Sequence, residues 1–240
     1  MLNFEYNNPI TPRDFEIEIN PNSHFYIKIN SAGRIEYVNQ DFCNVSGYTD
    51  YELIDESIEL LWHPDMPKVI FEILSENLAK KEKIRLVVKF ISKDGRYFWL
   101  TCDYETKTNE YGEIVGHYNH STFVYKHIVQ QLAPLYHILS KIEAKSGNTK
   151  ISKRYLVGYL EERNLSYNKY IDVLFKTIPE YEKNNPYYQN QPVKNTSLGQ
   201  EFHPNAQPSN PFHHHQSEME PQEKTVERKS LFQRIFGSKH

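Results

Sequence analysis

The most constraining feature of this sequence is a set of five short segments between residues 24 and 123 in which apolar and polar residues alternate. In the first segment, Phe25, Ile27 and Ile29 fall on one face, as in a β-strand that is buried on one side. The other four segments cover residues 35–37, 86–90, 97–101 and 114–123. Turn residues stand at Gly33, Gly95 and Gly112. The pattern therefore predicts five strands, most of them joined by tight turns.

The longest interruption lies between the second and third strands and is helical in character. Residues 40–46 predict a short helix that is broken by Gly47. Asp65 is placed to cap a second helix, with Pro67 in its first turn and an end near Lys80. Helices inserted at one point of such a chain pack together over its sheet. We therefore expect an α+β fold, with a five-stranded antiparallel sheet and helices on one face.

A longer helix is predicted after the sheet, over residues 127–144, because apolar residues recur there at spacings of four and three. These residues are Ile128, Leu132, Leu135, Leu139 and Ile142. Such a seam suits two arrangements, a helix packed against its own sheet and a helix that pairs in a parallel dimer or transmits a signal. Two further helices, over residues 152–162 and 167–177, predict a helical hairpin.

The composition of the chain changes near Lys183. The 240 residues are 38% hydrophobic, against roughly 45–50% in average soluble domains, and residues 184–222 are rich in Pro, Asn, Gln, Ser and His. We expect disorder there, because this composition buries too little apolar surface to offset the entropy of ordering. The run His213–His215 is either low-complexity sequence or a weak metal-binding tract.

The C-terminal tip has a different pattern, that of a short basic amphipathic helix. Its apolar side is formed by Leu231, Phe232, Ile235 and Phe236, and basic residues surround it. This pattern is typical of a peripheral membrane contact through residues 228–240, and also of a docking peptide for a partner's groove. A frayed, inert end is the third interpretation. The predicted organisation is an N-terminal extension (1–20), a sheet domain (21–125), a helical extension (126–182), a disordered linker (183–226) and the tip (227–240).

Several classes of protein are not supported by the sequence. No nucleophile motif, zinc-protease motif, phosphate-binding loop or dinucleotide fingerprint is present, so we expect no enzymatic activity. The formal charge of −3 argues against nucleic-acid binding. No apolar run approaches the roughly 18 residues of a membrane span, and two cysteines are too few for a disulfide framework. We expect a cytoplasmic protein.

Two groups of motifs give the chain a family resemblance. Residues 35–48, which read Ile-Glu-Tyr-Val-Asn-Gln-Asp-Phe-Cys-Asn-Val-Ser-Gly-Tyr, resemble the second strand and following helix of PAS domains. The ordered set His63-Pro64-Asp65-Met66-Pro67, Lys93-Asp94-Gly95 and Phe98-Trp99-Leu100 is similar to the PAS domain of bacterial aerotaxis receptors and their PAS-only energy-taxis relatives. The resemblance covers residues 10–146, and extends more weakly to about residue 175.

The resemblance implies a sensor that holds FAD in an apolar pocket over the sheet and signals redox or energy state to a chemoreceptor or other signalling protein. By motif, Asn39 and Asp65 would orient backbone or cofactor edges, and His63 would line the mouth of the pocket. Trp99 would pack on or beside the flavin ring. A homodimer through the PAS domain and the 127–144 helix is a further expectation.

Four positions differ from the family pattern around the expected pocket. Trp62 stands where an arginine is usual, Phe90 replaces an asparagine, and Ile84 and Ser75 each replace a tryptophan. These changes fit an altered flavin site, a site for another ligand, or a pocket filled by its own side chains. Trp62 and Phe90 therefore join the candidate site residues. The last alternative corresponds to a different function, that of a ligand-free dimerisation or scaffold module tethered by its tip.

Overall fold

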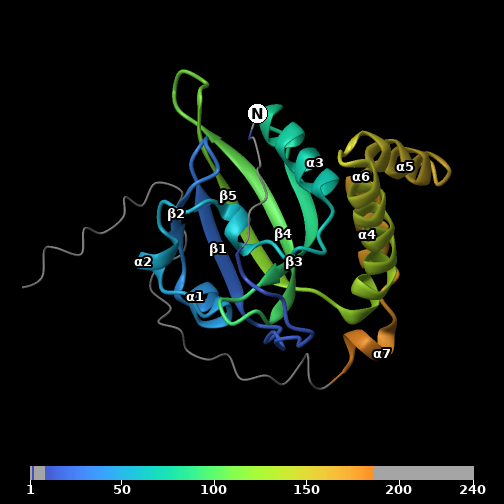
Figure 1. Ribbon diagram of the computed structural model, residues 1–240, viewed down its shortest axis with the longest axis horizontal. Helices are drawn as coiled ribbons and strands as arrows, with labels where there is room; N and C mark the ends of the chain where they lie inside the picture. Colours follow the sequence, from blue (N-terminus) through green and yellow to red (C-terminus); the bar gives the residue numbers. More distant parts are fainter. Residues whose placement is uncertain (1, 3–8, 186–240) are drawn as a thin grey trace, which may run out of the picture. The chain divides into compact units, whose positions relative to one another are not determined.

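The computed structural model describes residue 2 and residues 9–185. Its centre is a five-stranded antiparallel sheet with the strand order β2-β1-β5-β4-β3. The strands are β1 (His24–Ile29), β2 (Ile35–Val38), β3 (Ile84–Ile91), β4 (Tyr97–Thr108) and β5 (Ile114–Phe123). The predicted antiparallel sheet is confirmed (Figure 1).

Four helical segments separate β2 from β3, of which the sequence predicts the first and the last. They are α1 (Gln40–Ser46), α2 (Asp50–Leu53), the 3-10 helix η1 (Ile58–Leu61) and α3 (Lys68–Ala79). Local capping fixes the first two helices. The Asn39 side chain accepts a hydrogen bond from the backbone N–H of Phe42, and Thr49 and Glu52 form a reciprocal capping box. Gly47 ends α1 with a φ of 75°, a conformation that favours glycine.

The strand register divides the side chains between two faces of the sheet. Phe90 lies opposite Phe98 across β3 and β4, while Lys89 lies opposite Trp99. Because neighbouring residues of a strand point to opposite faces, Phe90 and Phe98 share one face and Trp99 lies on the other. We call these the inner and outer faces. The inner face carries the main apolar core, to which α1, η1 and α3 contribute Phe42, Leu61 and Phe71 among others.

The long helix α4 (Lys126–Ser146) packs against the outer face near β3 and β4. The ring of Tyr136 stacks on Trp99 with centroids 6.3 Å apart, and its hydroxyl donates to the Val87 carbonyl at 3.0 Å. The predicted apolar seam of this helix packs against the rest of the chain, since Ile128, Leu132, Leu135 and Leu139 are all buried. The parallel-dimer interpretation of this seam is therefore wrong for these four residues, because the chain's own domain already covers them.

The helical hairpin predicted after α4 is present as α5 (Lys150–Glu161) and α6 (Tyr167–Lys176), followed by the short α7 (Glu180–Lys183). Figure 1 shows α4, α5 and α6 grouped together beside β3, away from α1 and α2. The hydroxyls of Tyr136 and Tyr167 lie 2.7 Å apart and link α4 to α6. Lys153 links α5 to α3 through ion pairs with Glu72 and Glu76.

The start of α3 is not capped by Asp65, and that prediction is wrong. The helix begins at Lys68 after Pro67, which provides no side-chain cap. The Glu143 carboxylate of α4 accepts instead from the backbone N–H groups of Lys68 and Val69, at 2.7 and 3.0 Å. Glu182 serves the start of α4 in the same way, accepting from the His127 backbone N–H at 3.1 Å. Two helix starts are thus satisfied by carboxylates distant in sequence.

Part of the predicted organisation lies outside the described residues. This applies to the linker from residue 186 onward, the run His213–His215 and the tip at 227–240. Within the part that is described, no helix combines the length and apolar character needed to cross a membrane.

Candidate functional site

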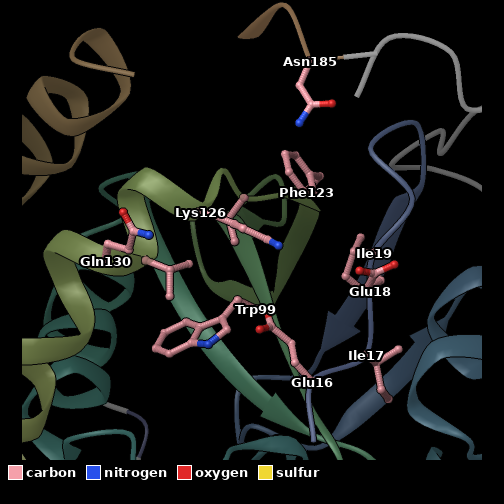
Figure 2. Close-up of a pocket in the computed structure, with 11 residues that line it drawn as sticks. Glu16, Ile17, Glu18, Ile19, Trp99, Phe123, Lys126, Gln130 and Asn185 are labelled. Carbon is pink, nitrogen blue, oxygen red and sulfur yellow. The ribbon is translucent and has the colours of Figure 1, made fainter. Parts of the chain in front are cut away.

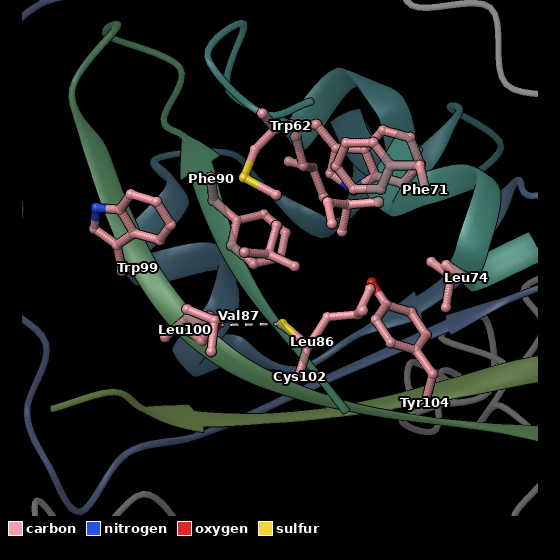
Figure 3. Close-up of a cluster of buried hydrophobic side chains, with 14 of the residues drawn as sticks. Trp62, Phe71, Leu74, Leu86, Val87, Phe90, Trp99, Leu100, Cys102 and Tyr104 are labelled. Atoms are coloured by element: carbon pink, nitrogen blue, oxygen red, sulfur yellow. Dashed lines mark hydrogen bonds between the residues drawn. The ribbon is translucent and has the colours of Figure 1, made fainter. Parts of the chain in front are cut away.

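The inner face carries a layer of aromatic side chains at the position predicted for a ligand. Trp62 is 1% exposed and lies flat on Phe71 of α3, with centroids 3.4 Å apart and planes inclined by 5°. Phe90 stacks on Phe98 at 5.5 Å, and the edge of Phe42 meets the Phe90 ring at 5.8 Å. The backbone pairs Trp62 with Phe90. The structure therefore brings two of the six predicted residues together, Trp62 and Phe90 (Figure 3).

Beside this layer lies a group of buried polar side chains that the sequence analysis missed. We call it the inner polar cluster, formed by Cys102 and Tyr104 of β4 and by His117, Asn119 and Ser121 of β5. The Ser121 hydroxyl contacts the Asn119 carbonyl oxygen and lies 3.2 Å from the Cys102 sulfur. The Tyr104 hydroxyl and the Asn119 amide nitrogen are fully buried, and neither makes a well-formed hydrogen bond within the described part of the chain, although the Asn119 side chain lies close enough to Tyr104 to influence its pKa.

Burial keeps the titratable members of the cluster neutral. Desolvation raises the pKa of the Cys102 thiol to about 12 and raises the pKa of Tyr104 well above its usual value. Desolvation also lowers the pKa of His117 to about 4. The Thr106 hydroxyl donates to the Leu78 carbonyl at 3.0 Å, so the His117 Nδ1–H donates to Thr106, also at 3.0 Å. His117 Nε2 is then an acceptor, and the cluster offers uncharged donors and acceptors.

His63 and Asp65 lie at the outer edge of β3, away from the cluster. The backbone N–H of Asp65 donates to His63 Nδ1 at 3.1 Å, and Lys89 pairs with the Asp65 carboxylate at 2.7 Å. Burial is the main cause that lowers the pKa of His63 to about 4, and the nearby Lys89 ammonium adds to it. The Ser140 hydroxyl of α4 donates to the Asp65 carbonyl at 2.7 Å. These two residues therefore join the sheet edge to α4.

The last two predicted residues, Asn39 and Trp99, do not face the inner polar cluster either. The Asn39 side chain accepts from the Tyr26 and Phe42 N–H groups and donates to the His24 carbonyl, so its polar atoms are engaged in holding β1 to α1. Trp99 lies on the outer face against Tyr136, and Figure 3 shows it across the sheet from Phe90. Placing Trp99 beside a ring held with Phe90 is therefore a wrong prediction, because adjacent register positions point to opposite faces.

A sequence signal for the inner polar cluster does exist. In the strand 114–123, His117, Asn119 and Ser121 alternate on the face that should be apolar. Polar residues at three successive inward positions of a strand are unusual in a core and are expected to be hydrogen-bonded. Together with the Tyr104 hydroxyl, they mark a place where a polar ligand edge would be satisfied.

The cluster suits the edge of a flavin ring, but the space beside it is small. A flavin edge presents both hydrogen-bond donors and acceptors, which uncharged hydroxyl, amide and imidazole groups can match. The cavity on this side, lined in part by Ser75, Leu78 and His117, has a volume of about 180 Å³, below the roughly 300–1,000 Å³ of most ligand sites. Admitting a flavin on this side therefore requires core side chains, such as those of the aromatic layer, to move. No grouping of three metal-ligating side chains occurs among the described residues.

Comparison with known proteins agrees with this architecture. Residues 35–117 match the PAS fold. The chain is 32% identical over 106 residues to the aerotaxis receptor of Escherichia coli strain K12. That region is 44% of this chain and 21% of the receptor, so the chain spans about a fifth of its relative's length.

Similar solved structures include further domains of this kind. One is a structure from a study of the light-oxygen-voltage domain mechanism with a flavin analogue, 18% identical, covering 46% of this chain and 84% of that one, with a TM-score of 0.43. Another is the PAS domain of the fruit-fly ELK potassium channel, 22% identical, covering 42% and 85%, with a TM-score of 0.38. From the fold and the sequence match, residues 35–117 of this chain are a PAS domain related to that of the aerotaxis receptor.

Proposed function

We propose that this chain is a sensory PAS protein without catalytic turnover, which binds a flavin of the FAD type at the inner polar cluster. In this proposal the state of that site reaches a signalling partner, such as a chemoreceptor, through α4. The observation that carries it is the pair of fully buried polar groups on Tyr104 and Asn119, neither of which makes a well-formed hydrogen bond to any residue that the structure describes. Leaving such groups unsatisfied costs about 1–3 kcal/mol each, so a ligand that pairs them gains that energy.

The flavin supplies the redox chemistry of such a sensor, and the chain's own residues supply binding and orientation. Tyr104 donates its hydroxyl proton and Asn119 its amide proton to acceptors on the ligand edge. His117 Nε2 accepts from a ligand donor. Phe90 and Phe98 provide an apolar surface beside the ring, and the neutral state of Cys102 and Tyr104 avoids burying a charge there.

The route from this site to α4 follows ring contacts and hydrogen bonds of the structure. Phe71, the stacking partner of Trp62, lies in α3, whose first N–H groups are held by Glu143 of α4. Trp62 also precedes the His63–Asp65 turn, which Ser140 of α4 holds at the Asp65 carbonyl. A ligand that displaces Trp62 therefore acts directly on two segments that are hydrogen-bonded to α4.

The test is a titration of the full chain with FAD, followed by flavin absorbance and fluorescence. We expect the unmodified chain to bind FAD. We expect the affinity for FAD to be at least about tenfold weaker in Tyr104→Phe and in Asn119→Ala, because losing one hydrogen bond to a buried group weakens binding by about that factor. Tyr111→Phe, at an exposed position, is the matched control. Unchanged affinity in both cluster variants would contradict the assignment of the site.

A second function is favoured by a specific observation, the close stack of Trp62 on Phe71 that fills the inner layer. It is that of a ligand-free interaction module, acting as a dimerisation or scaffold domain. A chain that remains colourless after refolding with excess FAD would favour this function over the first. The tip at residues 228–240 remains a predicted membrane or partner contact under either function.

A further inference from the structure

A second cavity, which we call the outer cavity, lies across the sheet from the inner polar cluster. Its volume is about 470 Å³, within the range of roughly 300–1,000 Å³ that is typical of small-molecule sites. Its floor is Trp99 of β4, and Phe123 and Val124 line another part of it. The walls are residues 16–19 on one side and Lys126, Val129 and Gln130 of α4 on the other (Figure 2).

The N-terminal wall is an ordered part of the fold. The Ile17 backbone N–H donates to the Tyr97 carbonyl at 2.7 Å, and the Tyr97 N–H donates to the Phe15 carbonyl at 3.0 Å. Glu16 therefore forms a parallel backbone bridge with Tyr97 at the start of β4, and Ile19, further along the same wall, is buried. Both walls are thus attached to the sheet through backbone pairing or helix packing.

Charges of opposite sign face the outer cavity without pairing. Glu16 and Lys126 both line it, yet neither forms an ion pair within the described part of the chain. They are close enough to interact, because the Lys126 ammonium counteracts the rise in the Glu16 pKa that burial causes. Figure 2 shows the Lys126 amine and the Glu16 carboxylate extending into the same space.

The Trp99 side chain supplies a donor in the same place. Trp99 is only 8% exposed, and its indole N–H makes no hydrogen bond to any described residue. Figure 2 shows the nitrogen-bearing edge of the ring turned toward the side of the cavity on which Glu16 lies. An indole N–H can only donate, so this group is available to an acceptor on a ligand.

We propose that the outer cavity binds a small amphoteric molecule with an apolar body, of the class of the apolar α-amino acids. Its carboxylate lies against the Lys126 ammonium and the Trp99 N–H, and its ammonium lies against Glu16. Its apolar part packs on the Trp99 ring and Val129. Such a molecule pairs each charge with its opposite in one partly desolvated space, where charge-assisted hydrogen bonds are strong.

This site has a direct connection to the signalling helix. Lys126, Val129 and Gln130 form the first turns of α4, so an occupant ties the N-terminal segment 16–19 to α4. The outer cavity is separate from the inner polar cluster, and the two sites are tested by different ligands. Failure of flavin binding therefore leaves this proposal intact, and the reverse also holds.

The experiment is isothermal titration calorimetry of the full chain with three probes that share one apolar body. They are phenylalanine, phenethylamine, which lacks the carboxylate, and 3-phenylpropionate, which lacks the ammonium. Leucine is titrated as a second amphoteric probe. We expect saturable binding of at least one amino acid, with both half-probes at least about tenfold weaker, since each lacks one charge-assisted contact.

Variants then assign the binding to the cavity. Lys126→Met and Glu16→Gln each weaken binding of the amino acid at least about tenfold, while Lys141→Met and Glu110→Gln, at exposed positions elsewhere, leave it unchanged. The proposal is overturned if neither amino acid binds, if a half-probe binds as tightly as phenylalanine, or if both cavity variants bind like the unmodified chain.

Discussion

At the scale of single residues, the unusual feature is a buried polar group that makes no well-formed hydrogen bond to any of the described residues. The Tyr104 hydroxyl is such a group. Tyr104→Phe removes it with little change of shape, so we expect the ligand-free chain to gain up to about 1–3 kcal/mol of unfolding free energy. Urea denaturation followed by circular dichroism measures this. A destabilised variant, alongside an unaffected Tyr111→Phe control, would mean that Tyr104 already has a partner.

Buried histidines give the chain a pH dependence whose sign can be worked out. The pKa of His117 is lowered to about 4, whereas an unfolded chain has about 6.5. Between these values the unfolded state binds the proton first, so stability present above pH 6.5 is lost as the pH falls toward 4. We expect His117→Gln to flatten this loss between pH 7 and 5 in urea titrations.

At the scale of elements, alternation predicts where the strands are but not which apolar face is the inner one. Trp99 and Phe90 both lie in strands with apolar residues on two faces, because α3 and the aromatic layer cover one side and α4 covers the other. The alternation of residues along one strand therefore cannot tell which face Trp99 or Phe90 lies on. The pairing register between β3 and β4 is needed for that. Asp65 was a reasonable cap by spacing, but the actual cap, Glu143, is 75 residues away in sequence. No local pattern predicts such a partner.

The Glu143 carboxylate of α4 connects this helix to the start of α3. Glu143 also accepts from the Ser152 hydroxyl at 2.8 Å, so the same carboxylate contacts the start of α3 and the start of α5. We expect Glu143→Ala to lose about 1–2 kcal/mol of unfolding free energy, the usual effect of removing a helix cap, as measured by thermal or urea unfolding. Glu161→Ala, on the exposed side of α5, is the control. Equal losses in the two variants would contradict the capping role.

At the scale of the whole molecule, the described chain is a PAS domain whose C-terminal helices pack back onto it. The elements next to the inner site, namely the turn at residues 62–66 and the start of α3, are also the elements that α4 holds. The sequence indicates a PAS-like sheet and a trailing helix. It does not indicate this coupling, which depends on hydrogen bonds between segments about 75 residues apart.

The most direct test of the account is hydrogen–deuterium exchange of the full chain with and without bound FAD. We predict that binding changes exchange in residues 62–71, around the inner site, and also in residues 126–146 of α4, which the ligand does not touch. Exchange in the hairpin between β4 and β5, near Gly112, should stay the same. A change confined to the inner site, with α4 unaffected, would contradict the claim that the site communicates through this helix.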